Sequence, residues 1–161
     1  MNCSSNSNLT PLFLVAQRGY SEIIDLLIRH RAAVDNPNKS GETPLYVAAK
    51  AGHLKVVKFL IKNGADVDVV VISQTRHCIS STVRSGLRMT PLYAAWFGST
   101  KGEVVDYLKR HSSRKLNLRL ATQNDHEEAI TFFTTSWKKN WTPITSLQKK
   151  LTITNSFFFC Q

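Results

Sequence analysis

One stretch of the chain, residues 43–68, contains the start and stop signals of a complete two-helix unit. Thr43 is a favourable N-cap, and Pro44 suits the first helical position, where a missing N–H costs nothing. Gly52 and Gly64 supply left-handed residues that can end two successive helices. Helices this short are unstable alone in water, so the unit must bury its apolar faces against neighbouring units or another surface.

The unit recurs along the chain. Thr10 stands 33 residues before Thr43, and a third copy opens at Thr90 and continues to Leu108, with one extra residue before Val104. The first two copies share residues at the same spacing: Ala16/Ala49, Gly19/Gly52, Leu27/Leu60, Ile28/Ile61, Ala32/Ala65, Val34/Val67 and Asp35/Asp68.

A 33-residue period that opens with Thr-Pro-Leu is the pattern of the ankyrin repeat, and the chain resembles an ankyrin-repeat protein over residues 9–116. The resemblance implies an all-α solenoid of stacked helix-turn-helix units joined by finger turns. We expect a polar segment at 1–9 and a repeat domain at 10–116, with repeats at about 10–42, 43–75 and 90–116 and an insertion at about 69–89. An irregular, disordered tail is expected at 117–161.

The chain departs from the family pattern at several positions. The His that usually follows Thr-Pro-Leu is replaced by Phe13, Tyr46 and Tyr93, so its bond to the Thr hydroxyl is lost or changed. Arg31 stands where Gly64 ends the second helix of the next copy. The extra residue in the third copy leaves the register of its inner helix open and predicts looser stacking of that copy.

Two segments interrupt or follow the repeats. The insertion lengthens the connection after Asp68 by 14 residues and is either a functional loop in the finger or a tolerated surface insertion. Both the insertion and the tail are predicted to be mobile and not needed for the fold. Residues 140–144 resemble the opening of a fourth copy, but the Ala pair and Gly that should follow are missing, which indicates chance or a decayed repeat.

The cysteine content bears on the cellular compartment. Three cysteines, Cys3, Cys78 and Cys160, are far apart and odd in number, which favours a reducing compartment. We therefore expect an intracellular protein, cytoplasmic in the first place and nuclear as the alternative. The sequence shows no signal peptide and no run long enough to cross a membrane. The first copy has no polar capping repeat before it, which favours a fragment of a longer array. The alternative expectation is a monomer.

Signals for catalysis and for cofactors are missing from the sequence. There is no phosphate-cradling Gly-rich loop, and the run His126-Glu127-Glu128 lacks the second His at helical spacing that a zinc protease needs. The adjacent pair His77-Cys78 has no accompanying ligands. The sequence therefore predicts a protein that is not an enzyme and that uses no cofactor and no metal.

The resemblance implies a binding surface on finger turns and on exposed positions of the inner helices. Carried over to this chain, the protein-binding residues are Gln17, Arg18, Lys39, Ser40, Glu42, Lys50, Ala51, Trp96 and Phe97. Trp96 either faces the groove or is wedged into the stack in place of an Ala. The predicted function is a non-catalytic scaffold that binds another protein.

Charge suggests an alternative function. The net charge is +10, and residues 69–161 hold 13 Lys and Arg against 5 Asp and Glu, compared with 8 against 6 in residues 10–68. The basic segments could attach to nucleic acid or to an anionic membrane surface. Nucleic acid is disfavoured, because this reading rests on charge alone and the aromatic residues form no RNA-binding motif.

Overall fold

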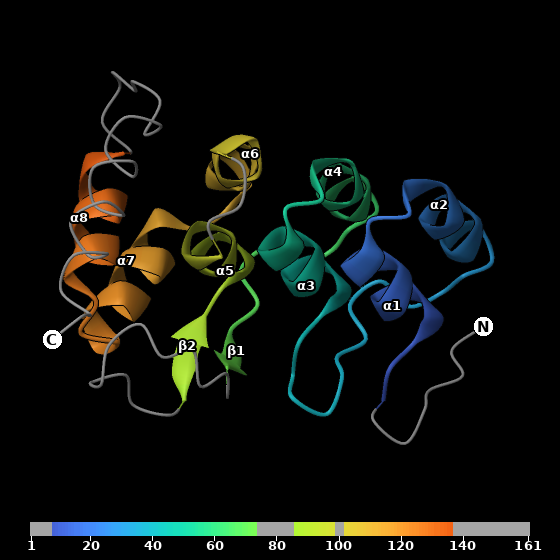
Figure 1. Ribbon diagram of the computed structural model, residues 1–161, viewed down its shortest axis with the longest axis horizontal. Helices are drawn as coiled ribbons and strands as arrows, with labels where there is room; N and C mark the ends of the chain where they lie inside the picture. The colour runs from blue at the N-terminus through green and yellow to red at the C-terminus, as the bar shows by residue number, and fades with distance from the viewer. Residues whose placement is uncertain (1–7, 74–85, 99–101, 137–161) are drawn as a thin grey trace, which may run out of the picture.

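The computed structural model describes residues 8–73, 86–98 and 102–136. In this part of the chain it contains eight helices and one two-stranded sheet: α1 Pro11–Arg18, α2 Ser21–Arg29, α3 Pro44–Ala51, α4 Leu54–Lys62, β1 Val71–Ser73, β2 Leu87–Met89, α5 Pro91–Phe97, α6 Gly102–His111, α7 Arg114–Gln123 and α8 Glu127–Thr135. Helices α1, α3 and α5 lie side by side in one layer, and α2, α4 and α6 form a second layer (Figure 1). The fold is the all-α repeat solenoid that the sequence predicts.

The three helices of the inner layer begin in the same way. The side chains of Thr10, Thr43 and Thr90 each accept a hydrogen bond from the backbone N–H three residues later, at 3.2, 3.3 and 3.2 Å. A proline follows each threonine. The helix start predicted at Thr43 is therefore confirmed, and the same cap serves all three copies.

The helix ends rely on left-handed residues. Gly19 and Gly52 end α1 and α3 with φ of 83° and 82°, and Gly64 follows α4 with φ of 87°. After α2 the left-handed residue is Arg31, with φ of 59°, and its N–H donates to the Ile28 carbonyl at 2.9 Å. The lack of glycine therefore does not extend α2, although a left-handed residue with a side chain costs roughly 1–2 kcal/mol.

The core runs continuously through the stacked layers. Every residue of α3 from Pro44 to Ala49 is buried, because α1 covers one side of this helix and α5 the other. Leu60 of α4 is fully buried, as expected from its place in the apolar stripe. Helix α5 is likewise buried from Pro91 to Ala95. The loose stacking expected for the third copy is thus not observed. Thr90 and α5 keep the register of Thr43 and α3, because the extra residue of this copy comes after α5 in the chain.

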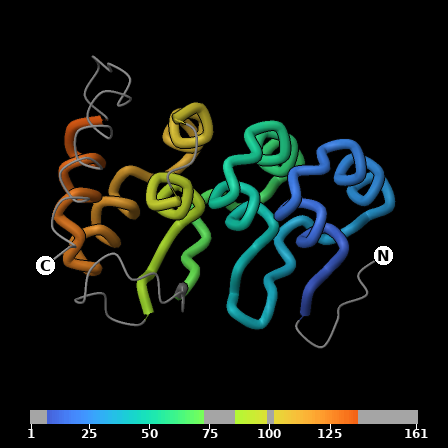
Figure 2. The backbone as a smooth tube through the Cα atoms, in the orientation of Figure 1, coloured from blue at the N-terminus to red at the C-terminus, as the bar shows by residue number. Residues whose placement is uncertain are grey.

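The two ends of the insertion pair as an antiparallel hairpin. Val71 of β1 is the partner of Met89 of β2, and both side chains are buried. The hairpin and the connection between α2 and α3 extend to the same side of the helical layers (Figure 2). These ends are therefore built into the fold, contrary to the expectation of a wholly mobile insertion. Residues 74–85, on which the choice between a functional loop and a tolerated insertion depends, lie outside the described residues.

Beyond Leu116 the structure differs from the predicted irregular tail, because α7 and α8 form a fourth helix pair. The side chain of Ser113 caps α7 by accepting a hydrogen bond from the Leu116 N–H at 3.4 Å. Asp125, with φ of 52°, lies between α7 and α8 in the place that Gly19 and Gly52 take between the helices of the first two pairs. Aspartate tolerates this conformation better than most residues, so the helix stop carries no glycine signature. The fourth-copy opening considered at residues 140–144 lies outside the described residues.

The fourth pair repeats the internal geometry of the first two. Ala129 and Phe133 take the places of Val56 and Leu60, and all four side chains are fully buried. The backbone N–H of the residue before the second helix donates to the carbonyl five residues earlier in each case, at 3.2, 3.0 and 3.1 Å: Tyr20 to Val15, His53 to Ala48 and His126 to Ala121.

Candidate protein-binding surface

The ends of α1 and α3 place four of the predicted binding residues at equivalent positions. Gln17 and Arg18 are the last residues of α1 and are exposed, while at the end of α3 Lys50 is half-buried and Ala51 is exposed. The two ends are tied together, because His53 Nε2 lies within hydrogen-bonding distance of the Gln17 carbonyl, at 3.1 Å. The structure thus brings these four residues into one strip.

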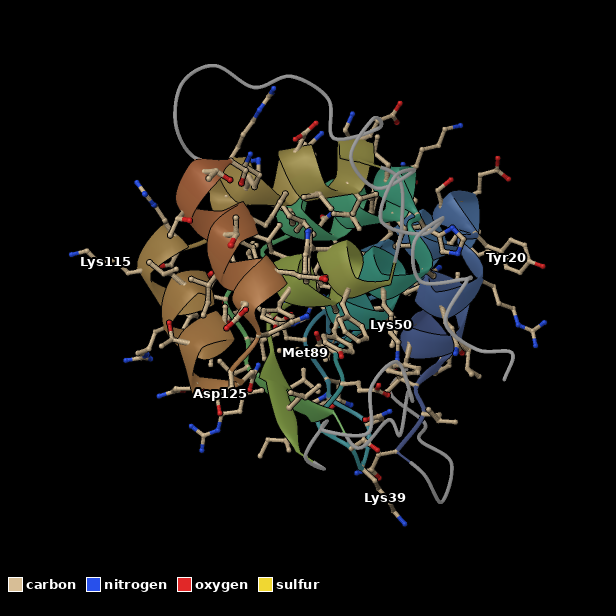
Figure 3. The ribbon with its side chains drawn as sticks, turned by 60° about the vertical axis from the view of Figure 1, so that its left-hand side comes forward. Tyr20, Lys39, Lys50, Met89, Lys115 and Asp125 are labelled. Atoms are coloured by element: carbon tan, nitrogen blue, oxygen red, sulfur yellow. The ribbon has the colours of Figure 1, made fainter. Side chains whose placement is uncertain are left out.

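The connection between α2 and α3 carries the next three predicted residues on a well-ordered turn. The side-chain oxygen of Asn38 accepts hydrogen bonds from the N–H groups of Ser40 and Glu42, both at 2.9 Å. The Asn38 amide also donates to the Glu42 carboxylate at 2.9 Å, which leaves Glu42 half-buried. Lys39 and Ser40 are exposed, and Lys39 points away from the helical layers at the tip of this turn (Figure 3).

Trp96 and Phe97 occupy a different environment from the rest of the strip. Trp96 is aligned with the fully buried Ala49 and is half-buried, with its ring 5.5 Å from Phe132 and 5.3 Å from His126, measured between centroids. The fourth helix pair thus covers much of this side chain. Phe97 is also half-buried and lies 5.8 Å from the His126 ring. Of the two alternatives for Trp96, the geometry favours wedging, against α8 in this case.

A buried polar contact lies inside this aromatic cluster. The Tyr93 hydroxyl is 2.7 Å from His126 Nδ1, and Tyr93 is fully buried. Burial raises the pKa of Tyr93 to about 12. Burial also lowers the pKa of His126, against a smaller opposing effect of Glu128. Both groups are therefore held in their neutral forms near neutral pH.

The Thr-Pro-Leu openings and glycine stops give no indication of this cluster, because the fourth pair has neither. The spacing from Ala121 to His126 and on to Phe133 is the same as that from Ala48 to His53 and on to Leu60. A comparison of these apolar and histidine positions alone would have indicated the fourth pair.

Further polar contacts join the fourth pair to the hairpin and to α5. The Asn124 side chain accepts from the Arg88 N–H at 3.3 Å and donates to the Arg88 carbonyl at 2.8 Å. The buried Asn117 accepts a hydrogen bond from the Thr90 hydroxyl. The Thr90–Asn117 bond pairs buried polar groups that would be costly to leave unsatisfied.

Positive charge gathers at the junction of α6 and α7. Residues 107–124 contain no Asp or Glu. Figure 3 shows Lys115 projecting outward from this end of the molecule. The exposed basic side chains of the segment are Arg110, His111, Arg114, Lys115 and Arg119.

The described residues also bear on two other kinds of site. Within residues 8–73, 86–98 and 102–136, no three His, Cys, Asp or Glu side chains are grouped so that they could bind a metal ion. Across these same ranges, no helix combines the length and apolar character that a bilayer crossing requires.

Comparison with known proteins places the repeat geometry in a family. A family model described as ankyrin repeats in three copies matches residues 1–71, and another described as ankyrin repeats in many copies matches residues 45–108. A search of curated proteins found no match. Ankyrin repeats are generally protein–protein interaction modules. Because the two models of this one repeat family together match residues 1–108, the chain belongs to the ankyrin-repeat family.

Proposed function

We propose that the protein is a non-catalytic scaffold that binds another protein on the concave strip defined by the ends of α1 and α3 and the turn between α2 and α3. The observation that carries this proposal is the sharp change in burial along α3. Its residues from Pro44 to Ala49 are buried in the stack, whereas Lys50 and Ala51 reach solvent. Side chains at the helix end are therefore available to a partner without a role in packing.

The strip has a definite chemical character. Arg18, Lys39 and Lys50 make it basic at the end of α1, on the turn and at the end of α3, and the partly covered Phe97 provides apolar surface further along. We expect a partner with acidic surface next to an apolar side chain, since complementary potentials steer association. The residues of the proposed site are Gln17, Arg18, Lys39, Ser40, Glu42, Lys50 and Ala51, with Phe97 and the exposed part of Trp96 at its edge.

Charge reversal on the strip tests this proposal. The double variant Arg18→Glu, Lys50→Glu should slow association with a captured partner by roughly tenfold or more and weaken the salt dependence of the rate, because exposed charges act mainly through steering. Surface plasmon resonance at several salt concentrations measures both effects.

A matched control uses exposed lysines of the second layer. Lys55→Glu, Lys62→Glu on α4 changes the net charge equally and should leave the association rate close to that of the natural chain. If the α4 variant slowed binding and the strip variant did not, the binding surface would lie on the outer layer and the proposal would be wrong.

The exposed cations of α6 and α7 support a second candidate, which is attachment to a phosphate-bearing polymer or surface. In this case the variant Arg114→Gln, Lys115→Gln, Arg119→Gln should elute from heparin or DNA at clearly lower salt than the natural chain. The same variant should bind the protein partner with unchanged affinity. Equal elution of both proteins would reject this candidate.

A further inference from the structure

The hydrogen bond between Tyr93 and His126 has a fixed direction. Asn124 accepts from the Arg88 N–H and donates to the Arg88 carbonyl, which fixes the orientation of its side-chain amide. Burial raises the pKa of Tyr93, and a hydrogen bond from the Asn124 side chain opposes this effect. An amide that favours the phenolate donates to the phenol oxygen. The Tyr93 proton is therefore left for His126 Nδ1, 2.7 Å from the hydroxyl, and this nitrogen is the acceptor.

Protonation of His126 conflicts with this arrangement. A charged imidazole donates from both ring nitrogens, so Nδ1 would present a hydrogen to a hydroxyl group that itself needs an acceptor. Tyr93 is fully buried, and His126 is the acceptor that its hydroxyl meets among residues 8–73, 86–98 and 102–136. A buried donor that loses its acceptor is costly. The closed contact therefore disfavours the charged ring.

His53, at the equivalent position of the second pair, meets a different kind of partner. Its Nε2 lies 3.1 Å from the Gln17 carbonyl, and a carbonyl only accepts. A protonated imidazole still donates to a carbonyl, so this contact between the first two pairs persists when the ring is charged. Between α5 and α8 the arrangement is reversed, because the histidine accepts. The sensitivity to acid is therefore specific to the fourth pair.

The charged groups around His126 do little to hold a charged ring. Burial lowers the pKa of His126, and the nearby Glu128 opposes this effect only in part. Helix α5 contains no charged residue, and α7 reaches the contact through the uncharged Asn124. From α6, Lys109 places a positive charge 5.9 Å from the centre of the Phe132 ring. The other charged residues of β2, α7 and α8 are exposed: Arg88, Arg114, Lys115, Arg119, Asp125, Glu127 and Glu128.

Helix α8 covers the aromatic residues at the edge of the concave strip. The centre of the Trp96 ring lies 5.5 Å from that of Phe132 and 6.2 Å from that of Phe133. The Phe97 ring lies 5.8 Å from His126, measured in the same way. Separation of α8 from α5 would therefore uncover Trp96 and Phe97 together, next to the basic residues of the strip.

We propose that the contact between Tyr93 and His126 is a pH-sensitive switch: protonation of His126 releases α8 from α5 and uncovers Trp96 and Phe97 as apolar anchors for a protein partner. The role of these anchors rests on the proposed function of the strip, whereas the opening is a property of the chain alone. An exposed histidine titrates near pH 6.5, so the open state gains up to about tenfold over the closed state between pH 7.5 and 5.5.

Hydrogen exchange of the full chain at these two pH values, corrected for the intrinsic exchange rates, tests the opening without a partner. The amides of α8 should be less protected than those of α3, and their protection factors should fall about tenfold at the lower pH. His126→Gln keeps a neutral acceptor for Tyr93 and should remove the fall, whereas His111→Gln, at an exposed position of α6, should retain it. Equal falls in both variants, or equal protection of α8 and α3, would overturn the proposal.

A second measurement on the natural chain needs no substitution. Long-range proton–nitrogen NMR spectra report which ring nitrogen of a histidine carries the proton. At pH 7.5 His126 should be protonated on Nε2, because Nδ1 accepts from Tyr93. A proton on Nδ1 would reverse the direction of the hydrogen bond and overturn the proposal. A His126 pKa above that of an exposed histidine would do the same, because the surrounding aromatic rings would then stabilise the charged ring.

The dye 1-anilinonaphthalene-8-sulfonate, an aromatic anion, serves as the probe for the uncovered surface. Its fluorescence with the natural chain should rise at pH 5.5 and should not rise with His126→Gln. An unchanged signal despite lower protection of α8 would show that Trp96 and Phe97 stay covered, and would overturn the proposal. Because Arg18→Glu, Lys50→Glu leaves the exchange of α8 unaffected, failure of the switch and failure of the binding strip are separate results.

Discussion

Arg31 and Asp125 both hold the left-handed backbone that glycine holds at equivalent helix ends, with φ of 59° and 52°. The two residues differ in how well their side chains suit this conformation, since aspartate is enriched there and arginine is not. Arg31 is also exposed, so its side chain makes no packing contribution that would offset the strain. Local strain is thus concentrated at one replaceable residue of the first repeat.

Arg31→Gly should stabilise the protein by about 0.5–1 kcal/mol. The relief of roughly 1–2 kcal/mol of backbone strain is reduced by the greater flexibility of glycine in the unfolded chain. Urea denaturation measures the change in the free energy of unfolding. Arg29→Gly within α2 is the control and should destabilise the helix. A destabilising Arg31→Gly would show that the arginine side chain contributes more than its strain costs.

At the level of elements, the attachment of α8 depends on a neutral histidine. The folded pKa of His126 lies below its unfolded value because burial disfavours the charged ring. At a pH between these two values the unfolded state binds more protons than the folded state, so stability rises with pH. The stabilising contribution of the neutral His126 ring is complete above about pH 6.5 and is lost as the pH falls below that value.

His126→Phe should remove this dependence while it keeps a ring in the cluster. Between pH 7.5 and 5.5 the natural chain should lose more stability than the variant, as measured by urea denaturation at each pH. Carboxyl groups that titrate in both proteins contribute equally to both pH profiles, so their effect cancels in the comparison. These groups include Asp35 and Asp106, whose pKa values burial raises. Identical pH profiles would exclude His126 as the source of the dependence.

The elements that could be predicted from sequence are those with local chemical signatures. Thr43 with Pro44 fixed a helix start, and the 33-residue period placed the equivalent starts at Thr10 and Thr90. The fourth pair could not be predicted from these signatures, because Ser113 and Asp125 perform the capping and stop functions with other residue types.

The candidate site was predictable only in part. Arg18 and Lys39 are exposed where the repeat pattern places them, because the pattern fixes which positions are not used in stacking. The environment of Trp96 depends on α8, more than thirty residues further along the chain, and its packing therefore could not be predicted from the third copy alone.

At the scale of the whole molecule, each helix pair depends on its neighbours for burial, so stability is a sum of units and interfaces. The fourth pair covers Tyr93 and Trp96 at one end of the array. Removing it would expose aromatic surface on α5 and leave the Thr90 side chain without Asn117. The fourth pair thus covers the aromatic surface that α5 would otherwise present to solvent.

Truncation after residue 113 should therefore destabilise the remaining repeats relative to truncation after residue 136. We expect a difference of about 2 kcal/mol or more in the free energy of unfolding, from the aromatic area exposed. Chemical denaturation of the two truncated proteins, followed by circular dichroism, measures the difference. Equal stability would mean that α7 and α8 add helix without supporting the stack.

The hairpin formed by β1 and β2 makes the connection between α4 and α5 a natural site for peptide display. Its ladder joins Val71 to Met89 and Ser73 to Leu87, and Asn124 holds the backbone of Arg88 from the other side. These contacts hold the two ends of the connecting segment side by side. Because each doubling of a flexible loop adds only about 0.6 kcal/mol of closure entropy, a flexible guest sequence twice as long as residues 74–85 should cost little in loop closure when it connects β1 to β2. A foreign epitope presented there would stand on a rigid two-stranded base beside the helical layers.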